Sequence, residues 1–105
     1  MEIEDKKILA EWLGWVFVEG SQGPEYFSCD SFEDKNRGLT IQCPTWNPDS
    51  NHYQFNEIWN KFNLSQKHVV LVRCKEAGSP INAVNLILSD LHKVCQIAVE
   101  VIKEA

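Results

Sequence analysis

Three stretches of the chain carry hydrophobic residues at helical spacing. Residues 3–13 place Leu9 and Trp12 on one side of a helix, and Gly14 can adopt the left-handed conformation that ends it. Residues 90–104 repeat apolar positions every three or four residues, with Ser89 as the expected N-cap. We therefore expect one helix near each end of the chain.

The middle helix follows a loop that contains two prolines. Asp49 or Ser50 is expected to cap its start, and the helix is expected to end near Asn63. Its apolar positions follow the i, i+3, i+4, i+7 pattern of a helix that packs on a core. These positions are Phe55, Ile58, Trp59 and Phe62.

Short runs of β-branched and aromatic residues predict strands in the first half of the chain. Residues 15–18 are expected to form one strand, and residues 26–29 its return partner across a turn at 20–24. Residues 39–43 predict a further short strand. Residues 30–38 between these runs are polar and acidic, which favours a surface loop.

The second half contributes one clear strand prediction and one ambiguous stretch. Residues 68–74 are continuously apolar enough to predict a central strand. Residues 82–88 fit a further strand or a backward extension of the last helix, and Asn82 and Asn85 favour the strand because they weaken a long helix. Together the elements predict a single α+β domain over residues 1–105. We expect a layered α/β/α-type sandwich with about three helices and a mainly antiparallel sheet of about four or five strands.

The composition is that of a globular, acidic protein. The chain is 44% hydrophobic, and its 10 basic and 15 acidic residues give a net charge of −5. Such a charge opposes direct binding of nucleic acid, which requires a basic surface, and suits a partner with a basic patch. The polar, acidic start of the chain lacks the pattern of a signal peptide, and the longest apolar run, residues 69–72, is far too short to span a membrane. We expect a cytoplasmic protein.

The residues that could carry chemistry form no recognised motif. Cys29, Cys43, Cys74 and Cys95 are widely spaced in apolar surroundings, which favours reduced, buried thiols over disulfides. His92 and Cys95 lie three positions apart on the last helix and could form a nucleophile pair, but the apolar position of Cys95 argues against it. The histidines and cysteines lack zinc-site spacing. We therefore predict no cofactor, no metal and no catalytic residue.

Two ordered stretches resemble one family of small phage proteins. Residues 9–15, LAEWLGW, place an Ala and then Gly-Trp after a short helix, and residues 46–62 follow a Trp and a Pro with a short Asp/Ser cap and an aromatic-striped helix. Residues 95–98, CQIA, are similar to the small-residue pattern of a closing helix. Together these stretches, about a third of the chain, resemble the phage ABA-sandwich family. The resemblance implies a sandwich fold and a phage genome, and hence the cytoplasm of an infected bacterium; it brings no catalytic residues.

A candidate binding surface combines loop aromatics with acidic residues. Trp46 lies in the proline-bounded loop next to Asn47, where a tryptophan either anchors an interface or folds back over the core. Tyr53 is less strongly placed in the core by periodicity, and Glu33 and Asp34 belong to the expected acidic loop. We expect these five residues to form the binding surface.

The leading functional hypothesis is a small non-enzymatic phage protein that binds and inhibits a host factor, for example a defence protein. Its partner would be a host or phage protein, or a small nucleotide-like ligand held where subunits meet, and a homodimer is plausible. The first alternative is a hydrolase-type enzyme that uses His92 and Cys95 or carboxylates. The second is a structural or assembly protein of the phage particle.

Overall fold

Four α-helices form most of the part of the protein that the structure describes. The computed structural model describes residues 1–20, 22–23, 26–27, 30–78 and 90–104. Within them α1 spans Ile3–Trp12, α2 His52–Lys61, α3 Leu64–Glu76 and α4 Leu91–Glu104. The helices predicted at 3–13 and 90–104 are confirmed as α1 and α4. Residues 82–88, and with them the choice between strand and helix, lie outside the described residues.

The strand predicted at residues 68–74 is wrong, because this stretch belongs to α3. A capping box begins the helix: Gln66 N–H donates to Asn63 Oδ1 over 2.8 Å, and Gln66 Oε1 accepts from Asn63 N–H over 3.0 Å. Val70 and Cys74, four residues apart, are fully buried, whereas the valines at 69 and 72 are partly exposed. A local cap and packing along one helical face therefore outweigh the β-propensity of the valine-rich run.

The middle helix, α2, is confirmed, but its cap is neither Asp49 nor Ser50. Asn51 caps it, since its Oδ1 accepts hydrogen bonds from Tyr53 N–H over 3.0 Å and Gln54 N–H over 3.2 Å. Asp49 is partly buried and paired elsewhere, as described below.

The three-stranded antiparallel sheet has the order β1-β4-β5, with β1 at Val16–Val18, β4 at Ser31–Asp34 and β5 at Leu39–Gln42. The strands predicted at 15–18 and 39–43 are thus confirmed. The loop predicted at 30–38 is wrong in its first half, which is β4. Phe32 is fully buried between two half-buried polar residues, so the strand has a period-2 pattern that its acidic composition concealed.

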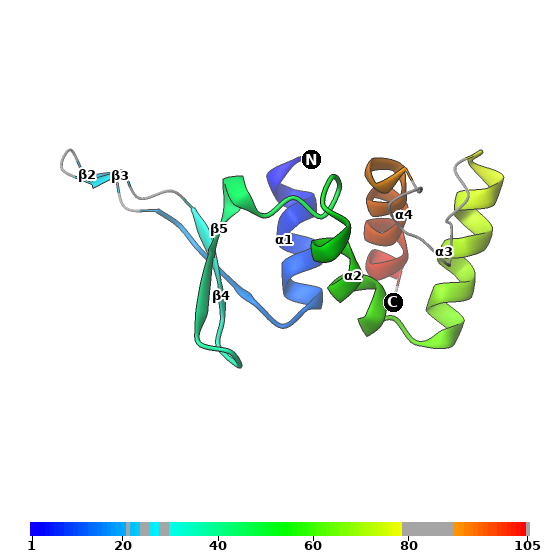
Figure 1. Cartoon of the computed structure of the whole chain (residues 1–105), viewed down its shortest axis with the longest axis horizontal. Coiled ribbons are helices and arrows are strands. Elements are labelled where there is room, and N and C mark those ends of the chain that lie inside the picture. The colour runs from blue at the N-terminus through cyan, green and yellow to red at the C-terminus, as the bar shows by residue number, and fades with distance from the viewer. Residues whose placement is uncertain (21, 24–25, 28–29, 79–89, 105) are drawn as a thin grey trace.

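A two-stranded ribbon extends the sheet away from the helices (Figure 1). β2 at Gln22–Gly23 pairs antiparallel with β3 at Tyr26–Phe27, so a strand at 26–27 is confirmed. Its predicted pairing with residues 15–18 is wrong, because β1 pairs with β4 and the partner of β3 lies inside the predicted turn at 20–24. Val18 pairs with Ser31, and Gln22 pairs with Phe27 in the same register. The ribbon therefore continues the β1–β4 pairing beyond the edge of the three-stranded sheet. The molecule is accordingly elongated, 48 × 23 × 22 Å.

The core lies between one face of the sheet and the helices, and the predicted α+β class is confirmed. Trp46 packs edge to face on Trp15 and Phe32, at ring-centroid distances of 5.1 and 5.4 Å, and Phe17 lies 5.7 Å from Phe32. All the described helices lie on the same side of the β4–β5 pair (Figure 1), so the expected α/β/α layering, with helices on both faces of the sheet, is not seen in the described residues. The described helices number four rather than the expected three, and the sheet has three strands rather than four or five. No helix in these ranges is long and apolar enough to cross a membrane.

Candidate functional site

Trp46 is a core residue and not part of a binding surface. Its side chain is 2% exposed and fills the space between Trp15 and Phe32. The short 3₁₀ helix η1, Cys43–Thr45, turns the chain inward just before it, and Trp46 N–H donates to the Cys43 carbonyl over 3.3 Å. Of the two alternatives for a loop tryptophan, the structure has the one in which it folds back over the core.

Asn47 is half-buried and serves as a link between α1 and the loop after η1. Its Oδ1 accepts a hydrogen bond of 3.1 Å from Lys6 Nζ, which also donates to the Cys43 carbonyl over 2.7 Å. Lys6 is only 8% exposed, although its acidic and basic neighbours suggest a solvated side chain. The burial of Lys6 could have been predicted from its position in the helix. Lys6 precedes Leu9 and Ala10 by three and four residues and therefore lies on the same buried face of α1.

The remaining predicted surface residues are divided between two elements. Tyr53 is 76% exposed on α2. Glu33 and Asp34 both line a hollow of about 300 Å³ at the β4–β5 turn, with Lys35, Gly38, Leu39 and Thr40. Asp34 is buried rather than displayed, and Arg37 Nε donates to its carboxylate. This hydrogen bond holds the pKa of Asp34 below its usual range, and Arg37 also reaches Glu57 of α2 at 3.2 Å.

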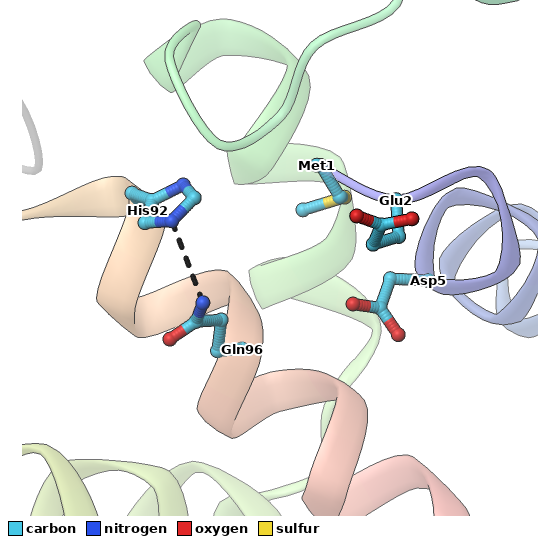
Figure 2. Close-up of a pocket in the computed structure, with 5 residues that line it drawn as sticks. All are labelled: Met1, Glu2, Asp5, His92 and Gln96. Carbon is cyan, nitrogen blue, oxygen red and sulfur yellow. Dashed lines mark hydrogen bonds between the residues drawn. The ribbon is translucent and has the colours of Figure 1, made fainter.

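A second pocket lies between the start of α1 and the first turns of α4. It has a volume of about 210 Å³ and is lined by Met1, Glu2, Asp5, His92 and Gln96. Figure 2 shows the carboxylates of Glu2 and Asp5 on the α1 side, opposite His92 and Gln96 on α4. None of these five residues was among the predicted surface residues, because their positions meet only when the two ends of the chain pack together.

Asp49 forms ion pairs with two residues that line this pocket, Met1 and His92. Its Oδ2 lies 3.4 Å from the Met1 amino group and 3.4 Å from His92 Nδ1. His92 Nε2 in turn lies 3.4 Å from Gln96 Nε2 (Figure 2). Burial alone would raise the pKa of Asp49, but the positive amino group and the His92 hydrogen bond outweigh it and lower that pKa. The pocket therefore displays the two other carboxylates, Glu2 and Asp5, and suits a cationic group better than a phosphate.

The His92–Cys95 pair does not have the geometry of a catalytic site. Cys95 is fully buried, and this burial raises the pKa of its thiol. His92 is an exposed side chain engaged with Asp49 and Gln96. Cys74 is likewise buried, which raises its thiol pKa to about 11. These two thiols are therefore poor nucleophiles in the folded protein.

In the ranges that the structure describes, no group of three or more His, Cys, Asp or Glu side chains is arranged to hold a metal ion. The whole chain matches no protein-family model, no curated protein and no solved structure.

The lowered pKa of Asp49 predicts a specific dependence of stability on pH. Because the folded state favours the ionised carboxylate, the stabilisation is present above the ordinary pKa of 3.8 and is lost as the pH falls through the lower folded value. Asp49→Asn should therefore be less stable than the wild type near neutral pH, and the difference should shrink in acid. Urea unfolding of both proteins across this range measures it. A difference that stays constant with pH would contradict the ionic role.

Proposed function

We propose that this chain is a small binding protein whose partner is a protein with a basic surface. The observation that carries the proposal is the distribution of charge. Residues 8–34 contain six acidic residues and no Lys or Arg, whereas the rest of the chain has nine acidic and ten basic residues. Five of these six acidic residues are described by the structure, and they lie in the second half of α1, directly after β1, directly before β4 and within β4. One-sided charge of this kind steers association with a surface of opposite sign.

The resemblance to phage ABA-sandwich proteins supports a phage origin for this binding protein. A phage protein that binds a basic host protein can inhibit it most directly by covering the basic surface with which the host protein binds its own target. We therefore propose inhibition of a host factor, such as a defence protein, in the bacterial cytoplasm. Expression of the chain in bacteria that carry a defence system should then restore plating of a phage which that system blocks.

Binding of a nucleotide-like ligand is less well supported than binding of a basic protein. The pocket between α1 and α4 displays the carboxylates of Glu2 and Asp5, which repel phosphate groups. The hydrolase alternative is also weakened, because it would require the buried Cys95 thiol to reach a substrate.

One observation favours a second candidate, a self-associating assembly protein. α3 exposes three large apolar residues on its outer side: Leu64 is 85% exposed, Val69 36% and Val72 39%. Its contacts in the described structure are mainly with α4. Sedimentation at increasing protein concentration would detect association through this helix, and Leu64→Ser should weaken it.

Fluorescence anisotropy with labelled probes tests the leading proposal. A short oligo-arginine peptide should bind at low salt, and its affinity should fall steeply as salt is added. A DNA duplex of similar length is the control and should not bind. Failure of the peptide to bind at low salt, or binding of the duplex, would contradict a basic protein partner.

A further inference from the structure

We propose that the outer edge of β5 pairs with the same edge of a second copy of this chain, so that two three-stranded sheets join into one. β5, Leu39–Gln42, is the last strand in the order β1-β4-β5, and among the described elements it packs extensively only on β4. A strand at the edge of a sheet presents unpaired backbone groups to which another strand can bind. This inference goes beyond the proposed function and does not depend on it.

The β4–β5 ladder determines which backbone groups lie at this edge. Cys43 N–H donates to the Asp30 carbonyl over 2.9 Å, at the pair that continues the register of the two strands. Hydrogen-bonded and non-hydrogen-bonded pairs alternate in an antiparallel ladder, so Ile41, two residues before Cys43, also bonds to β4. The N–H and C=O groups of Thr40 and Gln42 therefore point away from β4, toward the outer edge.

These outward groups are accessible. Thr40 and Gln42 are both exposed in the structure. Thr45 Oγ1 donates to the Gln42 carbonyl over 2.9 Å, which occupies one of the two lone pairs of that oxygen. No other hydrogen bond to these outward groups is formed by the residues that the structure describes. The edge can therefore accept a further strand without losing an existing bond.

The side chains of β5 favour a second copy over a charged partner. Sheet edges are commonly protected by lysine, proline or a bulge, but β5 is Leu-Thr-Ile-Gln and pairs with β4 without interruption. Two chains of net charge −5 can thus meet here without opposing like charges, whereas a charged partner would find no complement. On the core side Ile41 packs against the core and Leu39 is 50% exposed, so an added strand would also cover apolar surface.

A two-fold antiparallel pairing fits this strand in one register. With Thr40 opposite Gln42 of the second copy, all the outward groups find partners, and Ile41 lies opposite its own symmetry copy. If Gln42 lay opposite Gln42, then Thr40 would face Pro44, which has no N–H. If Thr40 lay opposite Thr40, then Gln42 would face Gly38, which lies outside the strand. We therefore expect the register that pairs Thr40 with Gln42.

Two double variants of the full chain test the association and its register together. Thr40→Lys with Gln42→Lys places like charges opposite each other and should weaken dimerisation about tenfold or more. Thr40→Lys with Gln42→Glu places opposite charges at the same positions and should strengthen it about threefold or more. Sedimentation equilibrium at increasing protein concentration measures both. The first variant changes the net charge from −5 to −3, so long-range repulsion alone would favour its association over that of the second.

Amide hydrogen exchange provides a readout at single residues. The N–H groups of Thr40 and Gln42 should exchange more slowly as the protein concentration rises. The N–H of Ile41, which bonds to β4, should be protected at every concentration and is the internal control. Added salt should strengthen the association, because it screens the repulsion between two acidic chains. Binding of an oligo-arginine peptide should show the opposite salt dependence.

Three results would overturn the proposal. The first is the absence of association up to about 1 mM protein, where even a weak specific dimer is populated. The second is an equal effect of the two double variants. The third is association that survives the double lysine variant but is lost in Leu64→Ser, on α3 at the opposite end of the molecule (Figure 1), because the interface would then lie on α3. Failure of the oligo-arginine peptide to bind would contradict the proposed function and leave the pairing of β5 unaffected.

Discussion

Trp46→Ala is expected to destabilise the protein by about 3–5 kcal/mol, the usual cost of truncating a buried tryptophan. Trp46 touches Trp15 and Phe32 edge to face and is only 2% exposed, so its removal leaves a cavity between β4 and η1 that neighbouring side chains cannot fill. Chemical unfolding followed by circular dichroism measures the loss. For a domain whose total stability is of the order of 5–15 kcal/mol, this variant can unfold at body temperature.

Two further substitutions keep this prediction testable if the alanine variant does not fold. Trp46→Phe retains much of the buried area and should cost less than the alanine change. Tyr53→Ala, at a position that is 76% exposed, should change stability by no more than about 0.5 kcal/mol. If Trp46→Ala were as stable as Tyr53→Ala, the tryptophan would be a surface residue and the interface hypothesis would return.

Lys6→Met is expected to destabilise the fold by about 1–3 kcal/mol, although a lysine on a helix is usually dispensable. The methionine occupies similar space but removes the donor to the Cys43 carbonyl and to Asn47 Oδ1. These two acceptors belong to the segment that positions Trp46, so the loss should loosen its attachment to α1. Thermal and urea unfolding of the purified variant measure the effect.

Lys7→Met is the matched control for Lys6→Met. Lys7 is partly exposed, pairs with Glu4 at 3.6 Å and lies 4.2 Å over the ring of Phe17, so its removal should cost about 0.5–1 kcal/mol or less. Equal effects of the two substitutions would show that the buried hydrogen bonds of Lys6 add little to stability.

Helical periodicity in the sequence determined where the first, middle and last helices lie. The apolar stripe of α2 and the glycine stop after α1 are local signals, and each depends on residues within a few positions of one another. The strand at residues 16–18 is similarly local. The acidic excess in residues 8–34 is a property of the sequence alone, and it supports the proposed partner independently of the fold.

Other features of the fold depend on tertiary packing and could not be predicted correctly from local sequence patterns. The valine-rich run of α3 has high β-propensity, and although the capping box of Asn63 and Gln66 is a local signal for a helix, the burial of Val70 and Cys74 on one helical face comes from tertiary packing. Trp46 could have pointed outward, and contact with residues from β4 and the segment after α1 brings it into the core. The pocket of Glu2, Asp5 and His92 joins opposite ends of the chain. Which carboxylates face outward was likewise decided by strand register, because side chains alternate between the two faces of a sheet and only pairing with neighbouring strands determines which face meets the core.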